Sequence, residues 1–87
     1  MGKFLTPAAS IMTHNDVFSL DENLIYEFRF YNGRVERGIL VGMDFIKNEF
    51  YLVKQGDLKS WREAPDRIKY QEKINIETIT NWKPIKL

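Results

Sequence analysis

The sequence predicts an all-β domain, a small five-stranded barrel that follows a short N-terminal helix. Three observations lead to this prediction. Apolar and polar residues alternate in short runs of strand length, an Asn-Gly pair at 32–33 marks a tight turn between two of them, and Gly38 and Gly42 interrupt the second run. Glycines inside a strand favour sharp bending, which a small barrel of the SH3-like type needs in order to close. A five-stranded open sheet packed on one helix is the alternative fold.

The composition indicates a single globular domain. The chain has 87 residues, is 44% hydrophobic and contains no cysteine, which excludes a disordered chain, a disulfide scaffold and a thiolate metal site. A net charge of +1 argues against a protein that covers duplex DNA, although a symmetric oligomer would still concentrate small basic patches. The apolar runs are too short to span a membrane and the N-terminus lacks the apolar core of a secretory signal, so we expect a cytoplasmic protein.

Residues 1–23 are predicted to form a helical turn and a loop that pack on a barrel made by residues 24–87. The helix is expected over residues 6–14, because Thr6 can cap it and Pro7 suits its first position. The loop that follows is expected to place Val17, Phe18 and Leu20 against the core.

The first three strands are predicted over residues 24–31, 34–45 and 48–53. Alternation along them places Phe28, Phe30, Leu40 and Leu52 on the inward face, so these side chains should be buried. The turn at Asn32-Gly33 requires positive φ at its central residues. We therefore expect Gly33 to have positive φ.

The second half of the chain is predicted to start with a polar connection over residues 54–67, with one helical turn that starts at Asp57. A fourth strand is expected over residues 68–74, a brief turn near 76–78 and a fifth strand over 79–85. Trp82, in the last strand, is expected to pack in the core or at the sheet edge.

The spacing of residues after the Asn-Gly pair carries a family resemblance. The motif consists of Asn32, Gly33, Arg34, Gly38, Leu40, Asp44 and Asn48. It resembles the first signature motif of the Sm-like (LSm/Hfq) family, and the similarity extends over residues 24–53. The resemblance implies an Sm-like barrel that binds RNA or a nucleotide-like ligand, and rings in which the fourth strand of one subunit pairs with the fifth strand of the next.

The same resemblance implies a binding site in the loop after the second strand, formed by Asp44, Ile46 and Asn48 and joined by Lys73. Lys73 and Ile74 stand where the bacterial branch of the family has a Lys-His pair. Ile46 stands where RNA-binding members have a side chain that stacks on a base, and an isoleucine offers no stacking surface. Asp44 and Asn48 also have a structural interpretation, since such side chains commonly accept hydrogen bonds from their own loop.

Two further alternatives stay open at this point. The chain could be a small barrel that mediates protein–protein contacts without binding nucleic acid, such as those that phages and mobile elements encode; Trp61 and Arg62 would then be the contact surface, or Trp61 would be a lid on the barrel. Self-association is also open: a neighbouring subunit could cover the exposed strand edges and form a homo-oligomer, or the loop at 55–67 could fold over them and leave a monomer.

Catalysis has little support in the sequence. One histidine and no cysteine leave no common metal-ligand set and no thiol nucleophile, the serines stand in no nucleophile motif, and no glycine-rich stretch matches a phosphate-binding loop. We therefore expect neither an enzyme nor a cofactor, and no catalytic or metal-binding residue is assigned.

Overall fold

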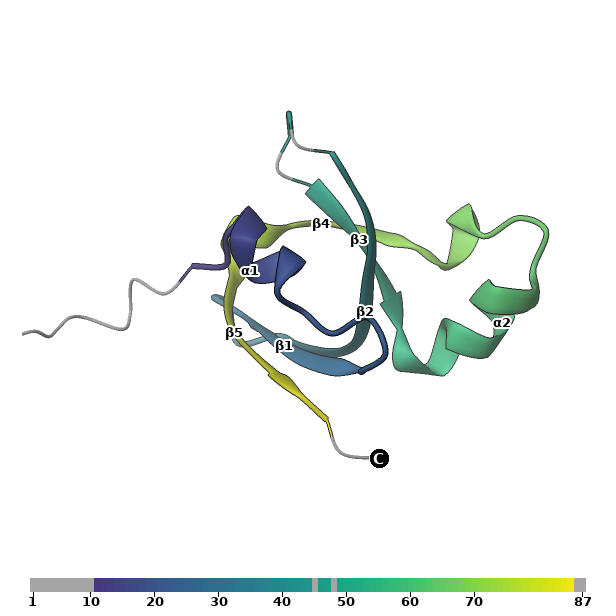
Figure 1. Cartoon of the computed structure of the whole chain (residues 1–87), viewed down its shortest axis with the longest axis horizontal. Helices are drawn as coiled ribbons and strands as arrows, with labels where there is room; N and C mark the ends of the chain where they lie inside the picture. The colour runs from purple at the N-terminus through teal and green to yellow at the C-terminus, as the bar shows by residue number, and fades with distance from the viewer. Residues whose placement is uncertain (1–10, 45, 48, 86–87) are drawn as a thin grey trace, which may run out of the picture.

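The computed structural model describes residues 11–44, 46–47 and 49–85. In these ranges the chain is mostly β, with two short helices and several 3-10 turns (Figure 1). Five antiparallel strands form one sheet in the order β4-β3-β2-β1-β5. The elements are α1 (His14–Phe18), β1 (Tyr26–Phe30), β2 (Val35–Asp44), β3 (Glu49–Lys54), η2 (Gln55–Asp57), α2 (Leu58–Glu63), η3 (Ile68–Tyr70), β4 (Glu72–Asn75), η4 (Ile76–Thr78) and β5 (Ile79–Pro84).

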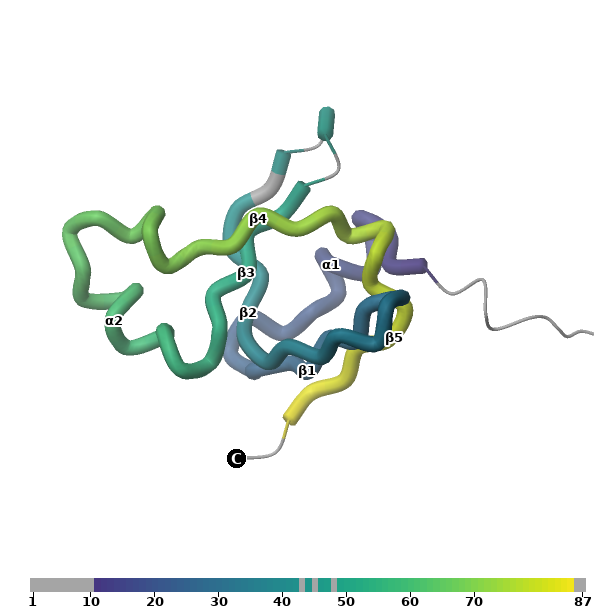
Figure 2. Tube along the Cα trace, turned by 180° about the vertical axis from the view of Figure 1, so that it is seen from behind, coloured from purple at the N-terminus to yellow at the C-terminus, as the bar shows by residue number. Residues whose placement is uncertain are grey.

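The prediction of five antiparallel strands is confirmed, and the sheet curls strongly around its core (Figure 2). The curl brings Arg34, just before β2, close to β4. Arg34 Nη2 donates a hydrogen bond to Glu72 Oε1 at a distance of 2.8 Å. It also brings Tyr31 N–H to the carbonyl of Thr78 at 2.9 Å. The edge strands β4 and β5 do not pair with each other, so the sheet of the described chain is open rather than closed.

The structure has a helix where a loop was expected. Thr6, Pro7 and most of the range 6–14 lie outside the described residues, whereas α1 occupies His14–Phe18, where a loop was expected. The reason is a reciprocal cap: Asp16 N donates to Thr13 Oγ1 at 3.2 Å, and Thr13 N donates to Asp16 Oδ2 at 2.8 Å. Aspartate thus takes the place of the usual glutamate in a capping box.

The turn between β1 and β2 has three residues, one more than predicted. Gly33 N donates to Phe30 O at 2.9 Å, and Phe30 N donates to Arg34 O at 2.8 Å. Gly33 has φ of 90°, which confirms the expected positive φ. A three-residue hairpin loop that ends in a left-handed glycine is a common alternative to the two-residue turn.

The two glycines of β2 have different roles: Gly42 lies at the predicted bend, whereas Gly38 permits a close approach to β3. A side chain at Gly38 would collide with the backbone of Val53 on β3, so glycine permits the close approach of the two strands. Gly42 has φ of 68° and lies where the β2–β3 register shifts between Val41 and Met43. Such a bulge bends the strand and increases its twist.

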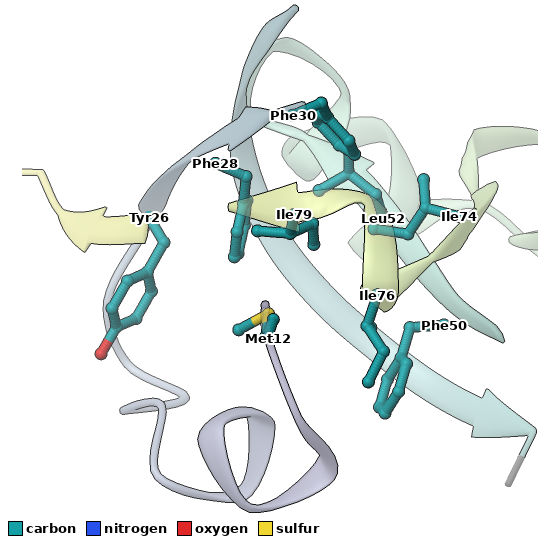
Figure 3. Packing of buried hydrophobic residues seen from close by; sticks show 9 residues of the cluster. All are labelled: Met12, Tyr26, Phe28, Phe30, Phe50, Leu52, Ile74, Ile76 and Ile79. Atoms are coloured by element: carbon teal, nitrogen blue, oxygen red, sulfur yellow. The ribbon is translucent and has the colours of Figure 1, made fainter. Parts of the chain in front are cut away.

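The core lies inside the curl of the sheet and includes one residue of the N-terminal segment. Nine buried side chains form it, and Figure 3 shows them converging from the strands and from the N-terminal segment. Phe28, Phe30 and Leu52 are buried as predicted, but Leu40 is only half-buried. The cluster consists of Met12, Tyr26, Phe28, Phe30, Phe50, Leu52, Ile74, Ile76 and Ile79. Val17, Leu20 and Trp82 pack against it as expected, whereas Phe18 is 58% exposed.

The connection at 54–67 contains η2 and α2, where one helical turn was predicted. Asp57 is the N-cap residue of α2, which agrees with the predicted helical start, and Leu58 is the buried anchor of the helix. α2 packs beside β3, and in Figures 1 and 2 it lies on the side of the molecule away from β5. The predicted fourth strand is shorter than expected, because residues Ile68–Tyr70 form the 3-10 turn η3.

Candidate functional site

The sheet register brings the loop after β2 and the end of β4 to the same end of the molecule. Asp44 pairs with Glu49 across the β2–β3 hairpin, and Glu49 pairs in turn with Asn75 on β4. We call the described residues at this end, Asp44, Ile46, Lys47, Glu49 and Lys73, the loop surface. Three of the four sequence-predicted residues are therefore close together in the fold. The fourth, Asn48, lies outside the described residues.

Asp44 has a structural role in this loop. Its Oδ1 accepts hydrogen bonds from Ile46 N at 3.0 Å and from Lys47 N at 3.2 Å. These two bonds form an Asx-type turn and occupy the carboxylate with its own backbone. Ile46 is 96% exposed at the tip of the turn and therefore offers an apolar contact.

Lys73 projects from β4 toward Glu49. Its Nζ lies 3.9 Å from Glu49 Oε1, a long ion pair between partly exposed groups, and such pairs contribute little to stability. Lys47 has no ion pair among the described residues. With Asp44 and Glu49 as the acidic members, the loop surface has no excess positive charge.

A second surface lies beside α2, where a cleft of about 520 Å³ opens between three parts of the chain. We call it the α2 cleft. One wall is the segment from Val17 to Leu24, the floor includes Ile39–Val41 of β2, and the other wall is α2. Its lining residues are Val17, Phe18, Leu20, Asp21, Glu22, Leu24, Tyr26, Ile39, Leu40, Val41, Trp61 and Arg62. The alternative contact residues Trp61 and Arg62 are thus neighbours in one cleft with mainly apolar side chains.

Trp61 is held in place by a residue that the sequence did not indicate. The guanidinium of Arg67 lies 5.0 Å from the centre of the Trp61 ring, and Arg67 Nη2 donates to the carbonyl of Arg62 at 3.2 Å. The indole N–H of Trp61 is buried and has no hydrogen-bond acceptor in the described chain. A cation at Arg67, six residues along the chain from Trp61, was the only signal in the sequence for this arrangement.

The side chains of Arg62 and Glu22 stand on different walls of the cleft, Arg62 on α2 and Glu22 in the turn at 21–24. Neither has a hydrogen bond or an ion pair to another side chain of the described residues. Tyr26, on the cleft floor, accepts a hydrogen bond on its hydroxyl from Asp21 N at 2.9 Å. The cleft therefore combines apolar walls with one uncommitted charge of each sign.

The resolved shifts in pKa lie outside both surfaces. Hydrogen bonding from Arg37, with Lys83 close by, lowers the pKa of Glu27 on the outer face of β1. Hydrogen bonds to Glu72 and Glu36 raise the pKa of Arg34. These shifts reflect ion pairs on the sheet, of which the Arg34–Glu36 pair is local and the others join different strands or their ends.

Within the described ranges, no group of three or more potential metal-ligating side chains is clustered. The helices described here are all too short, or too polar, to cross a membrane. The chain was also compared with known proteins. No protein-family model, no curated protein and no solved structure matches it.

Proposed function

We propose that this chain is a non-catalytic binding module of the Sm-like type, which contacts single-stranded RNA through the loop surface when several copies assemble. The observation that carries the proposal is the strand order. Its edge strands are β4 and β5, the two strands that the Sm-like resemblance implies should pair between neighbouring subunits. The loop after β2 and the residue Lys73 also lie at one end of the sheet, as that resemblance implies.

Assembly is part of the proposal because one loop surface binds weakly. Lys47 and Lys73 are its only described cations, and Asp44 and Glu49 offset them. RNA affinity depends strongly on the number of phosphates that cations neutralise. Several copies in one assembly would present several such pairs to the same strand, so weak contacts would add up through multivalency.

The strand edges can support such an assembly over part of their length. Met12 N donates a hydrogen bond to Ile79 O at 3.1 Å. The N-terminal segment therefore already occupies the start of β5. From Thr80 to Pro84, the only strand that pairs with β5 in the described chain is β1. Ile79 itself is fully buried in the core, so a proline at this position would unfold the subunit and cannot test assembly alone.

The test combines light scattering with fluorescence anisotropy of a labelled single-stranded RNA of mixed sequence at low salt. We expect RNA binding to appear at the same protein concentrations as assembly. The variant Lys73→Gln should weaken RNA binding. It should also reduce the slope of log affinity against log salt concentration by about one for each subunit that contacts the RNA. Lys59→Gln, an exposed lysine on α2, is the matched control and should change neither.

Two outcomes would refute the proposal. One is the absence of RNA binding in an assembled sample at low salt. The other is tight RNA binding by a protein that remains monomeric at high concentration. Tryptophan fluorescence adds a positional check: Trp61 lies on α2, outside the loop surface, so RNA held at the loop surface should leave its emission unchanged.

A further inference from the structure

Strand β2 continues well past the point where β1 stops pairing with it. The last pair between them joins Tyr26 and Gly38, whereas β2 runs on to Asp44 with β3 as its only described strand neighbour. The chain before β1 forms a turn, in which Leu24 N donates to Asp21 O at 3.0 Å, and no residue before Tyr26 belongs to the register with β2. The side of β2 from Ile39 to Val41 that faces away from β3 is therefore an internal strand edge with no described partner strand.

This edge lies in the α2 cleft, since Ile39, Leu40 and Val41 all belong to its lining. In an antiparallel sheet, backbone N–H and C=O groups point alternately to the two sides of a strand. Some backbone groups of this stretch therefore face the cleft and not β3. At Gly42 the strand bends at its bulge, which limits the usable edge to three residues.

The walls of the cleft show what kind of chain would fit beside the edge. Phe18 and Leu24 line the cleft and are 58% and 38% exposed, and large apolar side chains left exposed together mark contact sites. Arg62 on one wall and Glu22 on the other have no side-chain partners in the described chain. Apolar walls together with the carboxylates of Asp21 and Glu22 disfavour a nucleic acid in this position.

We propose that the α2 cleft docks an extended segment of another protein, which adds as a short strand to the free edge of β2 at Ile39–Val41. Strand addition satisfies the backbone groups of the edge and places alternate side chains of the segment against the apolar walls. The segment carries an acidic residue near Arg62 and a basic residue near Glu22. A helical partner would leave the edge of β2 unpaired, since a helix satisfies its own backbone groups. This site is separate from the loop surface and does not depend on RNA binding.

The experiment selects displayed random peptides of about twelve residues, long enough for a strand of ordinary length with flanking residues, on the full chain. We expect selected peptides that alternate apolar residues and carry one acid and one base. Bound to the isotope-labelled protein, they should slow hydrogen exchange of backbone amides within residues 39–41 and shift the indole signal of Trp61, while the signal of Trp82 stays in place. Methylating alternate backbone nitrogens of a selected peptide should abolish binding, because these nitrogens supply the strand hydrogen bonds.

Charge reversal at the walls sharpens the test. Arg62→Glu should weaken a selected peptide about tenfold, or about 1.4 kcal/mol, and reversing the acid of the peptide should restore binding. Lys59→Glu, also on α2 but outside the cleft lining, is the matched control and should have no effect.

Four results would overturn the proposal. These are selection of no peptide, selection of peptides that bind as helices, binding that is insensitive to backbone methylation, and a dimer of this chain that Arg62→Glu converts to a monomer. The last result would assign the cleft to a second copy of the chain. A negative result in the peptide experiment does not bear on the RNA proposal, since the Lys73→Gln experiment tests the loop surface and not the α2 cleft.

Discussion

The loop surface and the α2 cleft differ in how their polar groups are employed. At the loop surface, Asp44 Oδ1 accepts two backbone hydrogen bonds from its own loop and Lys73 faces Glu49, so these two charged side chains have partners, whereas Ile46 is exposed. In the α2 cleft, Arg62 and Glu22 are uncommitted and large apolar side chains are exposed. A residue of a sequence motif can thus hold a loop together, whereas the lining of the α2 cleft comes from segments that carry no motif.

The largest expected effect tests the core on which both surfaces rest. Phe28 is fully buried at the centre of the curled sheet. Phe28→Ala should reduce the free energy of unfolding by about 3–5 kcal/mol, enough to unfold most of a domain this small. Urea denaturation measures this change. A variant that stays folded with nearly the same melting temperature would mean that the inward face of β1 is assigned wrongly.

The next effect concerns the point where β2 leaves β1. A methyl group at Gly38 would collide with the backbone of Val53, so Gly38→Ala should destabilise the protein by about 1–3 kcal/mol. It should also disturb the α2 cleft more than the loop surface, because the displaced strand forms the cleft floor. Gly56→Ala is the matched control: nothing lies within contact distance of a side chain there. Equal stability of the two alanine variants, measured by thermal unfolding, would contradict the close approach of β2 and β3.

A smaller effect separates the two interpretations of Asp44. Asp44→Ala removes the acceptor of two backbone hydrogen bonds and should cost about 0.5–1.5 kcal/mol, whereas Asp44→Asn keeps an acceptor and should cost less. If the role of Asp44 is structural, RNA affinity measured by anisotropy should change little in Asp44→Asn. A large loss of affinity in the stable asparagine variant would instead make Asp44 a direct contact.

The smallest expected effect is on the pH dependence of stability, through Glu27, which lies outside both the loop surface and the α2 cleft. Arg37 lowers the pKa of Glu27 below its usual 4.5, so the folded state favours the ionised carboxylate. The stability that this provides is present at neutral pH and is lost as the pH falls below about 4.5 and through the lowered pKa. Glu27→Gln should therefore flatten the acid limb of the stability–pH curve, and Glu63→Gln on α2 should leave it unchanged. An acid limb of the same steepness in Glu27→Gln would show that the ion pairs to Arg37 and Lys83 do not contribute.

The sequence predicted what depends on local pattern. Alternation placed Phe28 and Leu52 in the core, and the conformational freedom of glycine located the turn at Gly33 and the bend at Gly42. Leu40 was expected to be buried and is only half-buried, because β1 begins opposite Gly38 and the α2 cleft opens beside the next residues of β2.

The features that the sequence did not predict depend either on two competing helix-start signals or on contacts between residues far apart in the sequence. The helix start at Thr13 was missed because Thr6-Pro7 offers a similar signal, and an aspartate three residues after Thr13 is a less common form of the cap. The α2 cleft could not be predicted, since its walls and floor come from three separate parts of the chain. The stacking of Arg67 on Trp61 likewise requires the turn after α2 to be known.

The contact between Met12 and Ile79 has a consequence for the order in which this protein can fold on the ribosome. Met12 is almost fully buried, and its N–H donates to the carbonyl of Ile79, so an early residue completes its environment only with one of the last strands. β1 likewise waits for β5, its second neighbour in the sheet. Contacts so distant in sequence form slowly, and a nascent chain that ends before β5 has an incomplete core. A chain that has emerged only as far as β4 should therefore keep Phe28 and Met12 partly unburied, and these side chains should need protection until β5 follows.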